Sequence, residues 1–425
     1  MMESTMINLK KLSFSKLFII TAVALAACEL SPVYSQNVAQ WRGINRDGQY
    51  SGINLLKEWP ANGPELLWFT EEIGNGYGAP TILNDRVFVN GETDSTSYLF
   101  AFDLKGKLLW KSPNGNEFTG SGFSHGFPGS RSTPTIMNNL AYACSGNGRI
   151  ACYETSNGAE KWAVDMVKDL GGRKTEFGYS ESLLVDAENV YCFPGGSTTN
   201  VAAFNRFTGK SVWTSKALGD TMTFCSPMLI KLPERKILVN LSRYFLFAVD
   251  CRNGELLWSY PIKSAKDDAK HCNTPIYTGG YLYSVSGEDK GDGTVKLELS
   301  PDGKSVKEIW TNNQVRNAMG GFVITDNTLF TTIDKNVLRA VELNKGTIVD
   351  SVKIRNGSLI YADHKFICYG NNGEVNLINY DQNKLTVSGK LKIEKGSKEH
   401  FAHPVLANGV LYIRHGKGLM AYKVN

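Results

Sequence analysis

The 425-residue chain is predicted to be an all-β protein, an eight-bladed β-propeller built from four-stranded antiparallel blades. Three observations support this prediction: a phrase that repeats along the chain, a Pro that recurs at the start of β-branched runs, and chain ends that complement each other. Self-similarity at a fixed period is the signature of an array of β-units.

The repeated phrase is an acidic residue or Asn, then a turn Gly, then Trp four residues after that Gly. Its copies are Phe102-Asp103…Gly106…Trp110, Tyr153-Glu154…Gly158…Trp162, Phe204-Asn205…Gly209…Trp213 and Val249-Asp250…Gly254…Trp258, with a stretched copy that ends at Trp310. From Trp68 to Trp310 these Trp residues lie 42 to 52 residues apart, a spacing that suits four short strands and their loops.

Two further signals lie between the Trp residues. A small or polar residue followed by Pro opens a β-branched run at Ala79-Pro80, Thr133-Pro134, Ser226-Pro227, Thr274-Pro275 and His403-Pro404. Pro lacks an N–H and is therefore tolerated best at the first residue of a strand. A turn and an alternating strand follow, as in residues 84–89 and 279–285, and the alternation indicates half-buried antiparallel strands. Each repeat is therefore a meander of strands A to D.

The chain ends predict how the meanders assemble. Residues 403–422 supply strands A, B and C of a last blade, whereas residues 64–68 supply a lone strand D. Pairing of these segments closes a ring and leaves no open sheet edge. Strands A that start near residues 80, 134, 182, 227, 275, 322, 359 and 404 predict eight blades. Seven blades are the alternative, because Asp350 and Val387 stand where Trp is expected in blades 6 and 7.

The N-terminus has the features of an export signal, a basic stretch followed by an apolar run at residues 17–27 that is too short for a mature membrane anchor. Leu25-Ala26-Ala27-Cys28 is typical of a bacterial lipobox, in which Cys28 is lipidated and anchors the chain to a membrane; cleavage after Ser35 is the alternative. We therefore expect a signal peptide at 1–27, an N-terminal arm at 28–63 and the propeller at 64–425. The mature protein would be exported, either anchored to the outer membrane or periplasmic or secreted.

Composition narrows the possible partners. The net charge of +5 falls to about +3 without the leader, because Lys10, Lys11, Lys16 and Glu3 leave with it, so a nucleic-acid surface is not predicted. Seven cysteines follow Cys28, an odd number placed mostly in alternating strands, which favours buried thiols over disulfides. Cys144 and Cys152 flank one hairpin turn and are the best candidates for a pair.

The meander geometry also sorts the loops into two faces. Since successive strands alternate in direction, the D-to-A and B-to-C loops share one face, and five of the six histidines fall in those loops. Residues just before strand A lie nearest the central channel. We therefore predict a ligand-binding funnel on this histidine-rich face, without a metal, formed by His125, Arg131, Glu181, His271, Arg316, His400 and His403. The alternative is that these side chains tie loops to neighbouring blades.

The repeated phrase, the Pro-led strands and the segment Trp41-Arg42-Gly43-Ile44-Asn45-Arg46-Asp47-Gly48 resemble the pyrroloquinoline-quinone (PQQ) repeat family of β-propellers, over roughly residues 41–425. That family contains quinoprotein dehydrogenases and also exported propellers without enzymatic activity, such as the lipoprotein of the outer-membrane β-barrel assembly machinery. Fold alone does not choose between them.

The resemblance implies two functions. Family dehydrogenases typically carry a disulfide between adjacent cysteines and a carboxylate base with calcium; this chain has no Cys-Cys pair, and Glu181 is the most plausible carboxylate. We therefore expect a binding or scaffold protein of the cell envelope whose partner is an envelope protein, a glycan or another small molecule. A PQQ-dependent dehydrogenase of alcohols or sugars, with PQQ and calcium as cofactors, is the alternative.

Overall fold

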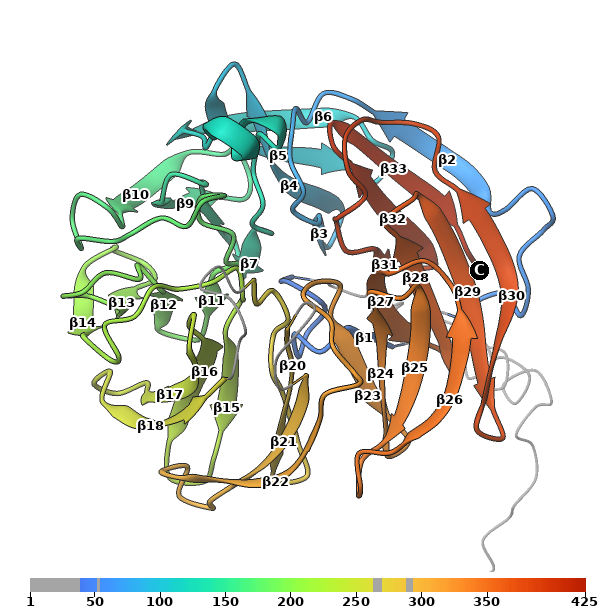
Figure 1. Cartoon of the computed structure of the whole chain (residues 1–425). Helices are drawn as coiled ribbons and strands as arrows, with labels where there is room; N and C mark the ends of the chain where they lie inside the picture. Colours follow the sequence, from blue (N-terminus) through green and yellow to red (C-terminus); the bar gives the residue numbers. More distant parts are fainter. Residues whose placement is uncertain (1–38, 52–53, 263–269, 288–292) are drawn as a thin grey trace, which may run out of the picture. The chain divides into compact units, whose positions relative to one another are not determined.

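The structure is a computed structural model that describes residues 39–51, 54–262, 270–287 and 293–425, all within one compact unit. In these residues, 33 strands and one short 3₁₀ helix, η1 (Gly122–Gly126), are present. The strands form eight sheets that follow one another around a central axis (Figure 1). The all-β eight-bladed propeller is confirmed and the seven-bladed alternative is excluded. The signal peptide at 1–27 and Cys28 lie outside the described residues and stay predictions.

Seven blades take strands A to D from consecutive segments of the chain, and each strand pairs antiparallel with the next. Blade 1 consists of β3 (Thr81–Leu83), β4 (Arg86–Thr93), β5 (Thr96–Asp103) and β6 (Leu108–Asn116), and blade 2 of β7 (Thr135–Met137), β8 (Leu140–Cys144), β9 (Arg149–Glu154) and β10 (Glu160–Asp165). Blade 3 consists of β11 (Leu184–Val185), β12 (Asn189–Cys192), β13 (Val201–Asn205) and β14 (Ser211–Ser215). Blade 4 consists of β15 (Met228–Lys231), β16 (Lys236–Leu241), β17 (Phe245–Asp250) and β18 (Leu256–Pro261). Blades 5 to 7 consist of β19 (Ile276–Thr278), β20 (Tyr281–Val285), β21 (Thr294–Leu299) and β22 (Val306–Asn312); β23 (Phe322–Thr325), β24 (Thr328–Ile333), β25 (Val337–Glu342) and β26 (Ile348–Lys353); and β27 (Gly357–Ala362), β28 (Lys365–Gly370), β29 (Glu374–Asp381) and β30 (Lys384–Lys392).

Blade 8 joins the two ends of the propeller. β31 (Val405–Ala407), β32 (Val410–His415) and β33 (Gly418–Lys423) supply strands A to C, and β2 (Glu65–Thr70) pairs antiparallel with β33 as strand D. The predicted closure is therefore confirmed. One strand was not predicted: β1 (Gln49–Tyr50) pairs in parallel with β27 and makes the sheet of blade 7 five-stranded. Two residues are too few to show an alternating pattern.

The repeated Trp joins each blade to the next one. The indole Nε1 of six Trp residues donates to a backbone carbonyl in the C-to-D turn of the following blade, over 2.8 to 3.2 Å, at Trp68, Trp110, Trp162, Trp213, Trp258 and Trp310. The turn Gly packs on that ring: at Gly106, where φ is +82°, an added Cβ would lie 2.7 Å from the Trp68 side chain. Gly is therefore needed at this position of the repeat both because φ is positive and because the Trp ring leaves no space for a side chain.

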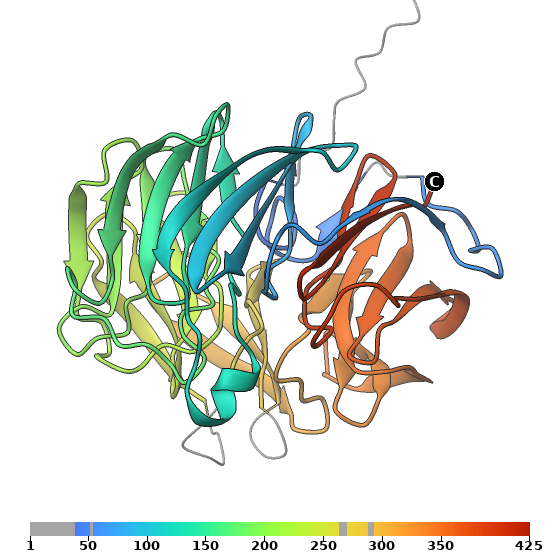
Figure 2. The same ribbon diagram turned by 90° about the horizontal axis from the view of Figure 1, so that it is seen from above.

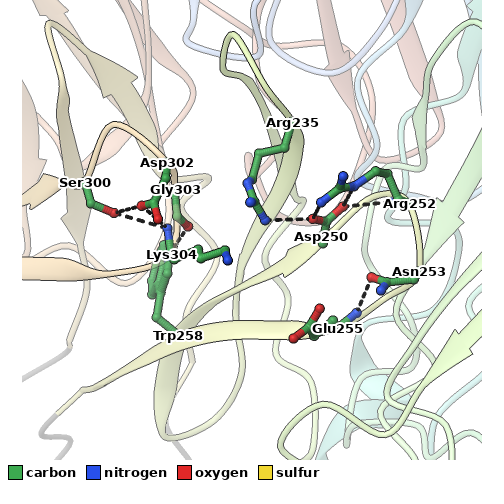
Figure 3. A network of polar contacts seen from close by, with 10 residues as sticks. All are labelled: Arg235, Asp250, Arg252, Asn253, Glu255, Trp258, Ser300, Asp302, Gly303 and Lys304. Carbon is green, nitrogen blue, oxygen red and sulfur yellow. Dashed lines mark hydrogen bonds and ion pairs between the residues drawn. The ribbon is translucent and has the colours of Figure 1, made fainter.

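The acidic residue of the phrase holds the same turn. In blade 4, Asp250 accepts the N–H of Arg252 at 2.9 Å and forms ion pairs with the guanidinium groups of Arg252 and Arg235 at 2.7 and 2.9 Å (Figure 3). The hydrogen bonds from Arg252 lower the pKa of the Asp250 carboxyl. Close by, Trp258 reaches Gly303 in the turn of blade 5 (Figure 3). A side-chain oxygen at this position thus accepts turn N–H groups that would otherwise lack a partner.

Blades 6 and 7 lack the Trp, and each junction is formed differently. Asp350 lies opposite Ala340, as Trp lies opposite Ala in several other blades, and its carboxylate accepts the N–H of Leu385 in blade 7 at 2.6 Å. On β30 the prediction that Val387 takes the Trp position is wrong: Gly389 holds it, and Val387, two residues earlier, packs into the core between blades 6 and 7. Trp59 of the N-terminal arm covers β30 at Gly389, so an indole from another segment packs on this blade.

Residues 39–50 lie on the central axis. Trp41 Nε1 donates to Thr274 Oγ1 before blade 5 at 3.1 Å, and Arg42 donates to the carbonyl of Phe322 in blade 6 at 2.5 Å. Arg46 donates to the carbonyls of Ser182 and Leu183 at blade 3, over 2.5 and 3.1 Å. A segment that contacts blades 3, 5 and 6 can lie only at the centre of the ring. Burial lowers the pKa of both arginines to about 10, which still leaves them charged at neutral pH.

The described cysteines are structural. No disulfide joins any of them, Cys144 and Cys152 included, and all except Cys272 are buried, as predicted for thiols in strands. In the described ranges, no helix is long and apolar enough to cross a membrane.

Candidate functional site

The loops before strands A form a pocket at one end of the channel, which we call the mouth. Its volume is about 310 Å³, and seven of its fifteen lining residues are Phe, Tyr or Trp: Trp41, Tyr77, Phe123, Phe127, Phe177, Phe224 and Phe401. The B-to-C loops lie on the same face, because D-to-A loops hydrogen-bond to them, for example from the N–H of Glu117 to the carbonyl of Ser95 at 2.9 Å. η1, which carries Phe123, projects beyond the strands of blade 2 (Figure 2).

Phe177 is the centre of the aromatic lining. Its ring centroid lies 6.3 Å from that of Phe123, 5.9 Å from that of Phe127 and 5.9 Å from that of Phe224, so loops of three blades meet on this side chain. Phe123 itself is 71% exposed. An exposed cluster of aromatic rings is typical of an interaction surface.

Arg131 lies among these rings. Its guanidinium carbon is 5.3 Å from the ring centroid of Tyr77 and 5.7 Å from that of Phe177, which is cation–π distance. Two of its N–H groups donate to the carbonyls of Gly129 and Phe127, at 2.8 and 2.5 Å. Burial lowers the pKa of Arg131. The rings and the two carbonyls fix the orientation of this cation.

A second cation lies beside Phe177. The Nζ of Lys270 is 5.5 Å from the centroid of that ring. No Asp or Glu among the described residues lines the mouth. The nearest acidic groups are engaged elsewhere: Glu399 accepts the O–H of Tyr77 at 2.8 Å, and buried Glu117 accepts the N–H groups of Phe118 and Gly146. The mouth is therefore an aromatic pocket that contains positive charge.

His403 is the other predicted site residue that lines the mouth. Its ring meets Trp41 edge to face at 4.5 Å, and its Nδ1 lies 3.4 Å from a guanidinium nitrogen of Arg42. Burial and Arg42 hold the pKa of His403 well below its usual range, so the ring is neutral and accepts a hydrogen bond from Arg42.

His400 lies apart from His403 and stacks on His415 at a centroid distance of 3.7 Å. Both ring nitrogens of His415 lie 2.7 Å from backbone carbonyls, those of Lys395 and Lys398. Burial and His415 lower the pKa of His400 to about 4. This histidine pair fixes the loop before blade 8 and does not line the mouth.

Glu181 is buried in the wall of the channel. Its Oε1 accepts the N–H of Phe193 at 3.0 Å, whereas its Oε2 has no hydrogen-bond partner. Burial raises the pKa of Glu181 to about 7. The hydrogen bond from Phe193 and the charge of Arg46 lower this pKa, but their effect is smaller than that of burial. Glu181 does not line the mouth.

The remaining predicted site residues also lie outside the pocket lining. His271 is buried, with its Nε2 3.3 Å from the carbonyl of Arg243, and burial lowers its pKa. His125 is exposed on η1, with its Nδ1 3.2 Å from the carbonyl of Thr119. Arg316 is half-buried. The structure thus brings Arg131 and His403 together in the mouth and leaves the other five around it.

PQQ and calcium can be tested against this lining. PQQ is a planar aromatic tricarboxylate, and the rings and Arg131 of the mouth fit such a group. Calcium needs several oxygen ligands, chiefly carboxylates. No carboxylate lines the mouth in the described ranges, and no cluster of three His, Cys, Asp or Glu side chains there could hold a metal. The mouth therefore fits the rings and carboxylates of PQQ but offers no ligand set for a calcium ion beside it in the described residues.

The opposite end of the channel opens between the A-to-B turns, in a hollow of about 930 Å³ that we call the hairpin hollow. Ile44, at the tip of the arm, is 75% exposed there. Two of the charges in the hairpin hollow have partners: Lys236 pairs with Asp186 at 3.0 Å, and Arg206 donates to the carbonyl of Ala187 at 2.8 Å.

Sequence reasoning missed Tyr77, Phe177, Phe224, Lys270 and Trp41 as mouth residues. A usable signal exists for some of them. Tyr77, Arg131, Phe224, Cys272 and Phe401 each stand three residues before the Pro that opens strand A, and all five line the mouth. This position turns toward the channel in every Pro-led blade and could have been identified from the repeat alone.

Comparison with known proteins places the chain in a family. Residues 95–352 match the family described as outer membrane protein assembly factor BamB. A search of curated protein sequences finds no significant match.

Solved structures show the same fold. BamB from Moraxella catarrhalis superposes with a TM-score of 0.61 at 12% identity, over 85% of this chain and 99% of that one. The computationally designed protein Ika8 superposes with a TM-score of 0.56 at 11% identity, over 83% and 99% of the two chains. The quinohemoprotein alcohol dehydrogenase ADHIIG from Pseudomonas putida HK5 gives 0.53 at 11% identity, over 92% and 80%. At these identities the likeness concerns the fold alone.

Proposed function

The chain belongs to the family of the outer membrane protein assembly factor BamB, and from this premise we propose that it is a binding scaffold of the cell envelope that uses the mouth as its docking surface. Its partner is a protein of the envelope, and export with a lipid anchor at Cys28 would hold the propeller at the outer membrane. A scaffold binds its partner through an exposed surface, and in this proposal that surface is the mouth.

The observation that carries this proposal is the aromatic lining contributed by loops of several blades. Phe123 is 71% exposed although Phe127 and Phe177 lie within aromatic contact of it, so the cluster is only partly covered by its own chain. Aromatic side chains of this kind are the residues that dominate protein–protein binding energy. The proposed binding surface is therefore rich in aromatic side chains, and of the residues predicted for a histidine-rich funnel only Arg131 and His403 line it.

The test is capture of envelope proteins by the purified mature chain. A double variant, Phe123→Ala with Phe127→Ala, should lose the captured partner. Phe207→Ala should retain it, because Phe207 is a half-exposed aromatic residue in the C-to-D turn of blade 3, on the other face. Undiminished capture by the double variant would show that the mouth is not the docking surface.

A PQQ-dependent oxidoreductase is the second candidate, favoured by one observation: the rings and Arg131 fit a planar carboxylate. Titration of the protein with PQQ and calcium, followed by absorbance and melting temperature, tests it. A ligand that binds only the folded state raises the melting temperature. A saturable rise that Arg131→Gln abolishes would support this candidate, and no rise at high micromolar PQQ would remove it.

A further inference from the structure

We infer that the mouth selects a protein segment that places a carboxylate beside aromatic or apolar side chains. This inference rests on the proposed docking function and names the chemistry of the docked segment.

The first argument is the charge of Arg131. Its guanidinium is largely surrounded by rings and donates to two backbone carbonyls, but it forms no ion pair with any described residue. A charge that is taken out of water costs free energy unless a partner of opposite charge compensates for it. A guanidinium presents five N–H donors in a fixed fork that matches a carboxylate. Glu117 and Glu399 act on Arg131 through their charges but form no ion pair with it, so a docked carboxylate would supply the direct partner that the described residues do not.

Lys270 provides the second argument, because it places another positive charge over the same ring of Phe177. Glu399, the carboxylate of the neighbouring loop, is bound to the hydroxyl of Tyr77. Two cations on one aromatic side chain, in a pocket without a described acidic residue, are complementary to an acidic ligand.

The third argument concerns size. A pocket of about 310 Å³ lies at the lower limit for a small-molecule site. Phe123 and Phe401 remain 71% and 36% exposed at its rim, so apolar surface extends beyond what a small ligand would cover. A peptide segment can fill the pocket and cover the rim together, which favours a protein segment over a free anion.

The experiment uses three acetylated and amidated peptides of one length, each with two Phe residues and with two Glu, two Gln or two Lys residues beside them. Fluorescence anisotropy measures their affinity for the mature protein at low and at high salt. We expect the Glu peptide to bind about tenfold more tightly than the Gln peptide, the difference that one charge-assisted hydrogen bond supplies. The Lys peptide should bind most weakly, and salt should reduce the preference for Glu.

Variants locate the effect. Arg131→Gln and Lys270→Gln should each reduce the preference for the Glu peptide over the Gln peptide. Arg131 also holds its loop through Gly129 and Phe127, so Arg131→Lys is the conservative variant, which keeps the charge, and Lys270→Gln leaves that loop intact. Lys231→Gln is the matched control, because it removes an exposed lysine from the hairpin hollow.

Equal affinity for the Glu and Gln peptides would overturn the inference, and so would a preference for Glu that both mouth variants retain. Neither outcome would contradict the proposed docking function, which the capture experiment with Phe123 and Phe127 decides separately. Loss of capture specificity in that experiment would overturn the docking function itself.

Discussion

The two ends of the channel differ in how their charges are satisfied. In the hairpin hollow Lys236 pairs with Asp186, and Arg206 and Arg46, which line it, donate to backbone carbonyls. In the mouth Arg131 also donates to two carbonyls, but Arg131 and Lys270 both lie over the ring of Phe177, and neither has an ion pair in the described part of the chain. One arm reaches both ends, with Trp41 in the mouth and Ile44 in the hollow.

The two ends therefore differ in whether their charged side chains can still pair with a ligand. A cation that already has an ion pair, such as Lys236, stabilises the ring and leaves little for a partner to gain. A cation fixed among aromatic rings gains when a carboxylate arrives. The same scaffold therefore carries an end built for stability and an end built for binding, and the following variants test that division.

The largest expected effect is on stability, from Arg46→Ala. The variant removes a buried cation and leaves the carbonyl of Ser182 without this donor, whereas the carbonyl of Leu183 keeps the hydroxyl of Thr135, so we expect the free energy of unfolding to fall by about 3 kcal/mol. Urea unfolding followed by Trp fluorescence measures this. The exposed Arg173→Ala is the control, with an expected change within about 0.5 kcal/mol. An Arg46→Ala protein as stable as wild type would mean that the arm is not part of the packed core.

The next effect is a pH dependence that Glu181 confers on the channel wall. Its folded-state pKa of about 7 lies above the ordinary value of 4.5, so the folded state holds this proton more tightly than the unfolded state does. Wild-type stability should therefore fall as the pH rises from 4.5 to about 7, by roughly 3 kcal/mol from this group.

Glu181→Gln removes the titrating group and should flatten stability over that interval relative to wild type. Urea unfolding of both proteins at several pH values measures the difference. If the stability of the two proteins changed in the same way with pH, the pKa of Glu181 would not be raised in the folded state.

Phe177→Ala is expected to change the free energy of unfolding less than the two preceding variants and to act mainly on peptide binding. Because Phe177 contacts rings of three loops and both cations of the mouth, we expect the affinity for the Glu peptide to fall at least about tenfold. Its half-buried position predicts a stability loss of only about 1 kcal/mol. Phe207→Ala should bind the peptide as wild type does. An unchanged affinity in Phe177→Ala would place the binding surface elsewhere.

The smallest effect is expected from Ile44→Ala in the hairpin hollow. Ile44 is 75% exposed, so its truncation should change stability by no more than about 0.5 kcal/mol and leave peptide affinity unchanged. Anisotropy and urea unfolding check both. A large loss of affinity would show that the two ends of the channel are coupled or that the hollow binds the peptide.

The blades could be predicted from sequence because their signals are local and repeated. Trp at the end of strand D and Pro at the start of strand A recur in fixed order, and the complementary ends predicted closure through β2 and β33. Asp350, which departs from the phrase, occupies the expected Trp position, whereas in blade 7 that position belongs to Gly389 and not to Val387.

The mouth was predicted only in part. Arg131 and His403 were expected there, but Glu181 and His271 turn into the wall, because a residue's distance from strand A, and not its membership of the loop, decides whether it faces the channel. The position of the arm depends on carbonyls of blades 3 and 6, which are far from it in sequence. No local pattern in Trp41–Gly48 encodes those contacts.

The most direct test of the division between the two ends is site-specific photo-crosslinking in living cells. A photoreactive phenylalanine replaces Phe123 in one variant and Ile44 in the other, two apolar positions that are 71% and 75% exposed at opposite ends of the channel. We expect position 123 to crosslink to an envelope protein and position 44 to give no specific product. Specific crosslinks from position 44 and none from position 123 would contradict the mouth as the docking surface.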